Sequence, residues 1–493
     1  MDNAATDLLA TGVPGLDDIL GGGLRRGACA LLEGVPGAGK TTLGTQFIHH
    51  GITACDEPGL IFSFEEFPHE IFRDARAFGW DLDALERQDK LRVVGTSPDV
   101  FSRETMQPGG LFDQLMEEIL PRRVLVDSIS LMAHVTRDPQ ELRELVYGLR
   151  NCFRRLGLTA MMTKEVASAD PEVIPFEEYV ADAVIRLSYR LIPESGDRLR
   201  EVEVTKSRTQ AHVSGRHLLE IGPNGLTVYP APRAGVLGAP APHAPLGTEP
   251  VTSGCRGLDH MLRGGLLPGS LTIVAGSTGV GKTVLGLQFL HAGARQGQRG
   301  LLISLEQTAD DLRRATASLG LPLEHLQPGG AISVFQGGSM QEPVGMTIAR
   351  IARAVKEVRP QRLVLDAIST LDRRPGDRLQ VRADLVALLD MLRASGATCL
   401  VCDETPGIIG GFAVTGGALV SAMADNIVAM RYVELASAMR RALSVLKARC
   451  VDHDKEIREY VIGQGGVELK DKFRVATGLL TGAPVRADVD GYF

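Results

Sequence analysis

The chain carries one phosphate-loop pattern twice. The pattern GxxxxGK[ST] matches GVPGAGKT at residues 34–41 and GSTGVGKT at residues 276–283. In such a loop the backbone N–H groups surround nucleotide phosphates, the lysine reaches the β- and γ-phosphates, and the final hydroxyl binds magnesium. An apolar run precedes each copy and an amphipathic run follows it, which is the strand–loop–helix order that the motif needs. We therefore expect two sites for ATP and Mg²⁺ rather than two glycine-rich turns that bind nothing.

The expected nucleotide-binding residues lie in the two loops and at the start of the helix after each loop. The glycines allow positive φ and let the backbone approach the phosphate oxygens closely. In the first copy the residues are Gly34, Gly37, Ala38, Gly39, Lys40, Thr41 and Thr42. In the second copy they are Gly276, Thr278, Gly279, Val280, Gly281, Lys282, Thr283 and Val284. Thr41 and Thr283 are also the expected magnesium ligands of the two loops.

The two loops belong to a duplication that covers most of the chain. TGVPGLDDILGGGLRRG at 11–27 matches SGCRGLDHMLRGGLLPG at 253–269, with the same glycines and the same Leu-Asp pair. Three further pairs follow in the same order: 59–66 with 300–307, 122–130 with 361–369, and 202–208 with 443–449. A repeat of this length indicates two copies of one domain. We expect domains over 1–229 and 251–493, joined by a linker over 230–250 that is rich in proline and alanine.

Each half has the residue pattern of an α/β fold. Short β-branched or leucine-rich runs alternate with longer helical patterns, which predicts a mostly parallel twisted sheet flanked by helices. Ligands of such sheets bind beyond the carboxyl ends of the strands. The matched segments all end strands, so we expect them to meet at one edge of each sheet.

Charge and hydropathy exclude several classes of protein. The formal net charge of −7 gives no overall attraction to nucleic acid or to an anionic membrane surface. The start of the sequence lacks a signal-peptide pattern, and no apolar stretch has the roughly 18 residues of a membrane span. We therefore expect a cytoplasmic protein with no membrane or nucleic-acid partner. Cys399 and Cys402 form a CxxC that has the pattern of a buried strand rather than that of a metal or redox site.

Two aspartates are candidates for the metal site. Asp127 and Asp366 each close an apolar strand, where a carboxylate can hold the water shell of a magnesium ion. The alternative is that each aspartate only caps the turn that follows.

Glutamates follow the next matched strand. Glu65 and Glu66 follow GLIFSF, and Glu306 follows GLLISL. A carboxylate there could act as the general base for attacking water or a hydroxyl. The alternative is a pair of solvated acids favoured by a helix N-terminus. Gln307 stands where the first half has Glu66, so chemistry in the second half is expected to be slower or different.

Two pairs of cations end later strands. Lys206 and Arg208, like Lys447 and Arg449, are two residues apart, so each pair faces one side of its strand. They are either solvated charges or cations that reach the nucleotide of a neighbouring subunit and stabilise its transition-state charge. The second alternative requires a head-to-tail interface that closes into a ring.

These residues resemble the KaiC group of RecA-like ATPases, the double-domain proteins of the cyanobacterial circadian clock and their bacterial relatives. The resemblance covers about residues 8–485 and is most specific over 424–460. It implies two tandem RecA-like P-loop domains in a two-tiered homo-hexameric ring, with ATP bound between subunits. It also implies a slow ATPase in the N-terminal tier, and autokinase and autophosphatase activities in the C-terminal tier. By the same resemblance Glu65 and Glu306 take the catalytic glutamate positions, and the four cations make the cross-subunit contacts.

The chain departs from that family in two places. The family's paired phosphoacceptors are a serine and a threonine, but here Ser421 is followed by Ala422. The residues alone favour helix packing for Ser421, and with the resemblance an acceptor role is an equal alternative. If the chain phosphorylates itself, we expect Ser421 to be the acceptor. The sequence stops after TGAPVRADVDGYF, where the clock protein continues into a tail that engages its activator. We expect no KaiA-type activator, and a KaiB-like or histidine-kinase-type signalling partner.

The leading functional hypothesis is an ATP-hydrolysing, self-phosphorylating serine kinase ring that acts as a timing or signalling regulator. One alternative is a RecA/RadA-type DNA-dependent ATPase, which the acidic net charge and the 5% aromatic content support poorly. A second alternative is a nucleotide-gated assembly scaffold without kinase activity, for which Gln307 gives slight support.

Overall fold

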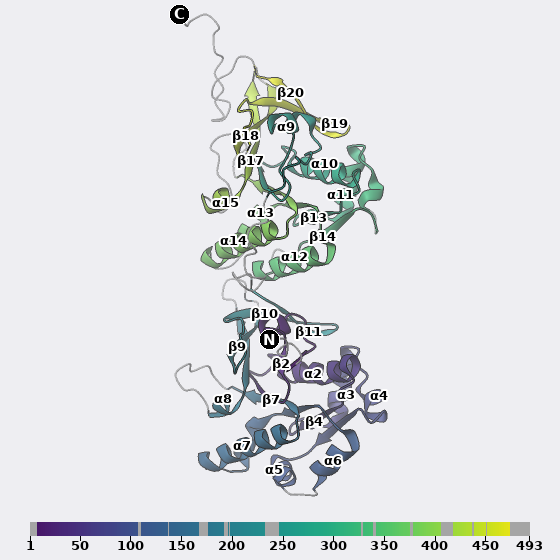
Figure 1. Ribbon diagram of the computed structural model, residues 1–493, viewed down its shortest axis with the longest axis vertical. Coiled ribbons are helices and arrows are strands. Elements are labelled where there is room, and N and C mark those ends of the chain that lie inside the picture. Colours follow the sequence, from purple (N-terminus) through teal and green to yellow (C-terminus); the bar gives the residue numbers. More distant parts are fainter. Residues whose placement is uncertain are drawn as a thin grey trace, which may run out of the picture. The chain divides into compact units, whose positions relative to one another are not determined.

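The computed structural model forms two compact units, residues 1–231 and 232–493 (Figure 1). It describes residues 7–106, 110–136, 138–166, 176–191, 196, 198–231, 246–326, 329–338, 342–374, 378–405, 418–435, 438–449 and 451–473. Most of the expected linker, 232–245, lies outside the described residues, and the domain limits at 229 and 251 stay predictions. None of the helices in the described part of the chain has the length and apolarity that spanning a bilayer needs.

The first unit is built around one sheet. Its elements are β1(Leu8–Leu9), α1(Leu16–Ile19), β2(Leu24–Arg25), β3(Cys29–Gly34), α2(Lys40–Cys55), β4(Gly59–Ser63), α3(Pro68–Ala77), α4(Leu82–Arg87), β5(Leu91–Gly95), α5(Pro98–Met106), α6(Leu111–Ile119), β6(Arg123–Asp127), η2(Ile129–His134), α7(Pro139–Arg155), β7(Thr159–Glu165), α8(Phe176–Val180), β8(Ala183–Leu191), β9(Arg198–Ser207), β10(Arg216–Gly222) and β11(Gly225–Tyr229). Within the described residues the main sheet has nine strands in the order β11-β10-β9-β8-β3-β7-β6-β4-β5. The strands from β8 to β5 pair in parallel, and β9, β10 and β11 pair antiparallel.

The second unit repeats this plan. Its elements are α9(Arg256–Met261), β12(Leu271–Gly276), α10(Lys282–Ala294), β13(Gly300–Ser304), α11(Ala309–Ser318), η3(Leu323–Leu326), β14(Ile332–Gln336), α12(Val344–Val358), β15(Arg362–Asp366), α13(Ile368–Asp372), α14(Arg378–Ala394), β16(Thr398–Glu404), α15(Ala418–Met423), β17(Asn426–Leu435), β18(Ala438–Ala448), β19(Arg458–Gly463) and β20(Gly466–Lys472). The sheet order among the described residues is β14-β13-β15-β16-β12-β17-β18-β19-β20. The strands from β14 to β17 are parallel and the last three are antiparallel.

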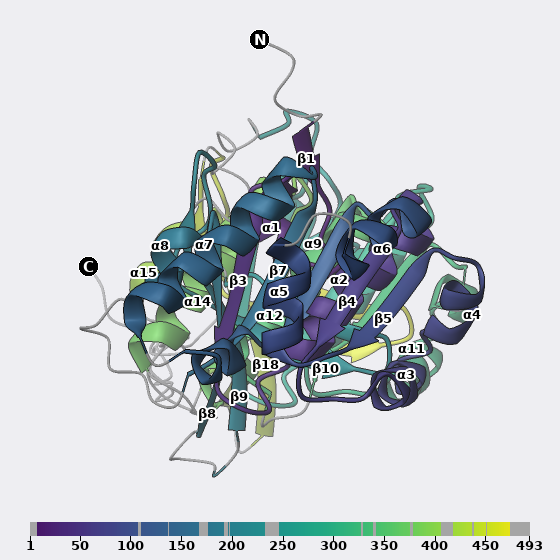
Figure 2. The same ribbon diagram turned by 90° about the horizontal axis from the view of Figure 1, so that it is seen from below.

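Helices cover both faces of each sheet. The consecutive β3 residues Leu31 and Leu32 belong to different cores: Leu31 packs with α5, α6 and α7, and Leu32 packs with α2 and α3. These two groups of helices can be followed in Figures 1 and 2. In the second unit α12 and α14 cover one face, and α10 and α11 cover the other. A strand covered on both sides must be apolar throughout, which is why β3 and β12 are continuous buried runs. The predicted α/β class, with a mostly parallel sheet between helices, is confirmed.

A buried arginine ties the phosphate-loop helix to the sheet in each unit. Arg123 is fully buried at the start of β6, where it forms a 2.7 Å ion pair with Glu57. Its guanidinium also donates to the carbonyls of Ala10 at 2.9 Å and Phe47 at 3.0 Å and lies over the Phe47 ring. Gly51 of α2 leaves room for it, since a Cβ there would lie 2.3 Å from Arg123 Nε.

Arg362 holds the same place in the second unit with neutral partners. It donates to Gln298 at 2.6 Å and to the carbonyls of Thr252 at 2.8 Å and Phe289 at 2.9 Å. Because burial disfavours its charged form, the pKa of Arg362 falls to about 10.

Replacing Arg123 with alanine should destabilise the first unit strongly. The change leaves two carbonyls without their partner and the Glu57 carboxylate with Arg26 alone, a loss of about 3–5 kcal/mol for a broken buried pair. Trp80 is the single tryptophan of the sequence and is buried in this unit, so its fluorescence during urea unfolding reports this unit alone. Arg122→Ala, at the exposed neighbouring position, is the control and should change the free energy of unfolding by less than about 0.5 kcal/mol. Equal effects of the two changes would contradict the buried-pair explanation.

Candidate functional site

Each phosphate loop joins the central strand of its sheet to a helix that begins at the motif lysine. α2 begins at Lys40 after Gly39 (φ 104°), and α10 begins at Lys282 after Gly281 (φ 109°). The positive φ expected of the glycines is confirmed at Gly37, Gly39, Gly279 and Gly281. The expectation of positive φ is wrong for Gly34 and Gly276, where a glycine instead lets the backbone of a neighbouring strand come close. A Cβ on Gly34 would lie 2.3 Å from the carbonyl oxygen of Leu187, and one on Gly276 would lie 2.2 Å from that of Met430.

The two lysines lie inside their own loops. Lys40 Nζ donates to the carbonyls of Gly34 at 3.0 Å and Val35 at 3.2 Å. Lys282 Nζ donates to those of Gly276 and Ser277, both at 2.8 Å. Each ammonium is therefore held where the N-terminus of the helix also favours an anion.

The remaining loop residues take supporting places. Ala38 and Val280 are fully buried and belong to the cores below the loops, while Thr41, Thr42, Thr283 and Val284 are partly buried in the first helical turns. The apolar positions therefore anchor the loop, and the hydroxyls remain at its rim.

The second unit brings its expected metal ligands together. Thr283 Oγ1 donates to Asp366 Oδ2 at 2.6 Å, and burial raises the pKa of Asp366. A hydroxyl and a carboxylate beside a phosphate loop are the hard oxygen donors that suit Mg²⁺. In the first unit Asp127 instead accepts a hydrogen bond from Thr163, and Thr41 lies at the start of α2.

The glutamates lie at the same carboxyl edge. Burial raises the pKa of Glu65, and the charges of Glu165 and Asp127 raise it further. Burial and Asp127 also raise the pKa of Glu66. In the second unit Glu306 Oε1 accepts a hydrogen bond from Thr370 Oγ1 at 2.6 Å. The expectation that these strands end at one edge is met, because β3, β7, β6 and β4 are successive parallel neighbours.

Sequence reasoning missed one acidic residue in each unit. Glu165 ends β7 and lies 3.9 Å from Lys40 Nζ. Glu404 ends β16, accepts a hydrogen bond from Thr278 of the loop and pairs with Arg373 at 2.6 Å. Burial raises the pKa of Glu404, but the hydrogen bonds from Thr278 and Arg373 outweigh it and lower the pKa overall. Both residues end the strand next to the loop strand, which is the signal that could have revealed them.

The four cations do not lie at this edge, so that part of the expectation is wrong. Lys206 pairs with Val184 at the start of β8, and Lys447 pairs with Ile427 at the start of β17. β9 and β18 run antiparallel to those strands, so their last residues lie at the amino edge of the parallel strands, opposite the phosphate loop. Each pair does face one side, as predicted: Lys206 and Arg208 both donate to the carbonyl of Tyr179.

Ser421 lies at the same amino edge, in α15. This helix precedes β17, whose first residue, Asn426, is level with Thr272 near the start of β12. The carbonyl of Ser421 accepts a hydrogen bond from Lys447 at 2.9 Å, and that of Ala422 accepts one from Arg449 at 2.6 Å. The cations thus hold the segment that carries the candidate acceptor.

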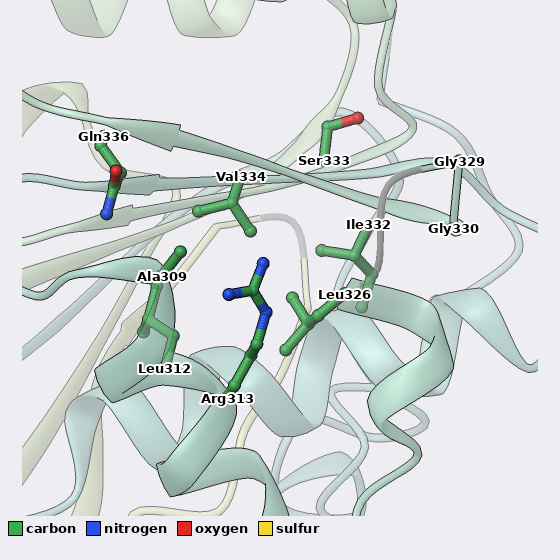
Figure 3. A pocket seen from close by; sticks show the side chains of 10 residues that line it. All are labelled: Ala309, Leu312, Arg313, Leu326, Gly329, Gly330, Ile332, Ser333, Val334 and Gln336. Atoms are coloured by element: carbon green, nitrogen blue, oxygen red, sulfur yellow. The ribbon is translucent and has the colours of Figure 1, made fainter.

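Two other features lie outside the site. A pocket of about 320 Å³ lies on the edge strand β14, where Figure 3 shows Arg313 directed between α11 and that strand. Three strands separate β14 from β12, so this pocket is not the phosphate site. Cys399 and Cys402 are buried in β16, as expected, and burial raises the pKa of Cys399 to about 12.

Lys447→Met should loosen α15. A hydrogen bond to a charged group contributes about 1.5 kcal/mol, and about 1.4 kcal/mol corresponds to a tenfold change in an equilibrium. We therefore expect backbone hydrogen exchange over 418–423 to accelerate about tenfold by mass spectrometry. Lys470→Met, which removes a lysine of β20 paired with Glu468, is the control and should leave this segment unchanged. Unaltered exchange in Lys447→Met would show that the cation does not hold the helix.

Comparison with known proteins agrees with this geometry. The family described as "ATPase: KaiC" matches the chain twice, at residues 9–233 and 251–473. The circadian clock oscillator protein KaiC of Thermostichus vulcanus is 32% identical over 99% of this chain and 94% of its own length. The proteins of that name from a Picosynechococcus species (32%; 98% and 93%) and from Prochlorococcus marinus (30%; 98% and 96%) are similarly close. The chain belongs to the KaiC family of ATPases.

Proposed function

We propose that this chain forms a head-to-tail ring in which each unit hydrolyses ATP at the boundary between subunits, and in which the second unit also phosphorylates Ser421. The family supports ATP hydrolysis directly; the ring, the serine kinase activity and the magnesium requirement are the proposal. One observation carries it: in each unit the phosphate loop and the cations lie at opposite edges of the same sheet.

The distance between the two edges rules out a site completed within one unit. β12 has six residues, and at about 3.3 Å per residue it separates the edges by roughly 20 Å. Lys447, Arg449 and Ser421 therefore cannot reach the phosphate loop of their own unit. A second copy placed head to tail brings the amino edge of one subunit to the carboxyl edge of the next, and repetition closes a ring. We propose a homo-hexamer, as the resemblance to the KaiC group implies.

The residues at each carboxyl edge fit phosphoryl transfer. Lys40 and Lys282 would bind the β- and γ-phosphates, and Thr41 with Asp127 and Thr283 with Asp366 would hold Mg²⁺. The metal would neutralise charge on the bridging oxygens. Glu65, with Glu66 beside it, would take a proton from water as a bond forms to the γ-phosphorus and the bond to the leaving oxygen of ADP breaks. Glu306 would do the same in the second unit, both for water and for the hydroxyl of Ser421 on the neighbouring subunit.

The partners follow from the same proposal. The relatives carry the name of a circadian clock oscillator, so we infer a timing or signalling role with a KaiB-like or histidine-kinase-type partner. Stimulation of turnover by single-stranded DNA would instead favour a DNA-dependent ATPase. Ring formation without turnover would favour a nucleotide-gated scaffold.

Mixing two inactive variants tests transfer between subunits. Lys282→Ala removes the phosphate contact of the second unit, and Ser421→Ala removes the acceptor. Neither variant alone should incorporate label from [γ-³²P]ATP, whereas a mixture should, because a Ser421→Ala subunit can phosphorylate a Lys282→Ala neighbour. Native mass spectrometry must show mixed assemblies. If the wild type is labelled but the mixed rings are not, the proposed transfer between subunits is contradicted. If the wild type itself is unlabelled, the proposed kinase activity is contradicted.

The pH dependence of the first unit should respond to Glu165. The pKa of Glu65 is raised above its usual value, so its ionised form is lost at a higher pH than for an ordinary glutamate, and turnover should fall early on acidification. Glu165→Gln removes one like charge, so the acid limb of the profile should move to lower pH. Turnover is measured at saturating ATP in a Lys282→Ala chain, with Glu118→Gln on α6 as the control. An acid limb that stays in place would argue against Glu65 as the base.

A further inference from the structure

The two units hold their corresponding glutamates differently. Glu306 accepts a 2.6 Å hydrogen bond from Thr370, whose side chain is 1% exposed in α13. Thr370 is the fourth residue after the strand-ending Asp366. In the first unit the fourth residue after Asp127 is Leu131. A leucine side chain has no donor, so the first unit cannot hold Glu65 in this way.

The other carboxylates of the second-unit edge are held by threonines too. Asp366 accepts from Thr283, and Glu404 accepts from Thr278 while it pairs with Arg373. These contacts join the loop and the ends of β15 and β16. In contrast, burial raises the pKa of Glu65 most, and the charges of Glu165 and Asp127 raise it further. Each of these three acids of the second unit therefore has a hydroxyl donor, and the donor to Glu306 comes from α13 rather than from the loop.

We propose that Thr370 is a positioning residue that fixes the direction of the Glu306 carboxylate for proton transfer in the second unit. This inference rests on the proposed role of Glu306 as the general base. The hydroxyl donates to Oε1, which restricts rotation of the carboxylate and leaves Oε2 to accept the proton. A fixed position matters because a misplacement of about 1 Å costs on the order of 100-fold in rate.

Thr370→Val removes the hydroxyl and keeps the shape of the side chain. Measured in full-length chain carrying Lys40→Ala, so that the second unit dominates turnover, kcat should fall about tenfold while KM for ATP changes less than about twofold. The split is expected because the hydroxyl bonds to Glu306 and not to the phosphate loop. Thr370→Ser restores the donor and should return kcat to within about twofold. If KM for ATP rises by as much as kcat falls, or if serine does not restore kcat, Thr370 has a packing role and the proposal is overturned.

A double-mutant cycle separates this inference from the function on which it rests. Glu306→Gln should lower kcat, and adding Thr370→Val to it should lower kcat no further, because both changes act through one carboxylate. If the two effects multiply, Thr370 acts by another route and the inference is wrong. If Thr370→Val has no effect while Glu306→Gln lowers kcat, the inference fails and the base assignment stands. If Glu306→Gln leaves kcat unchanged, the base assignment itself fails.

Discussion

Parallel hydrogen bonding of the phosphate-loop strand to both neighbours is the constraint on which both units depend. β3 lies between β7 and β8, and β12 lies between β16 and β17, so each loop leaves the middle of its sheet at a buried edge. With both faces covered, these strands can be displaced only at the cost of both cores. The helix after each loop is then fixed against the sheet, and the buried Arg123 and Arg362 join it to β6 and β15 and to the segment that begins each unit. The loop thus follows a strand that is buried on both faces and hydrogen-bonded on both sides.

The reversal of chain direction after β8 and β17 gives each unit two functional edges. The candidate metal ligands, the loop lysines and the glutamates lie at one edge because they follow parallel strands. Lys206, Arg208, Lys447, Arg449 and the candidate acceptor segment lie at the other edge because the next strand runs back. This separation is what the proposed head-to-tail ring requires.

The duplication preserved the scaffold and let the electrostatics diverge. Arg123 pairs with Glu57, whereas Arg362 makes equivalent hydrogen bonds to neutral Gln298. At the carboxyl edge it is the second unit whose acids have the closer hydrogen-bonding and charged partners. The first unit leaves Glu65 among like charges, and the second gives its acids threonine or arginine partners. Two copies of one fold thus present similar residues in different electrostatic surroundings.

The sequence by itself determined the two loops, the duplication, the α/β class and the strand-ending acids, since each is a local pattern of residue types with a fixed spacing. It also placed each cation pair on one side of its strand, because side chains alternate along any strand. Only the tertiary structure decided that these cations lie opposite the loop, since an apolar run reads the same in parallel and antiparallel strands. Likewise, Glu165, Glu404 and Thr370 gain their partners through contacts between strands and helices far apart in the chain. Strand direction and the neighbours of each residue are set by strand pairing across the sheet, and a local sequence pattern does not contain this information.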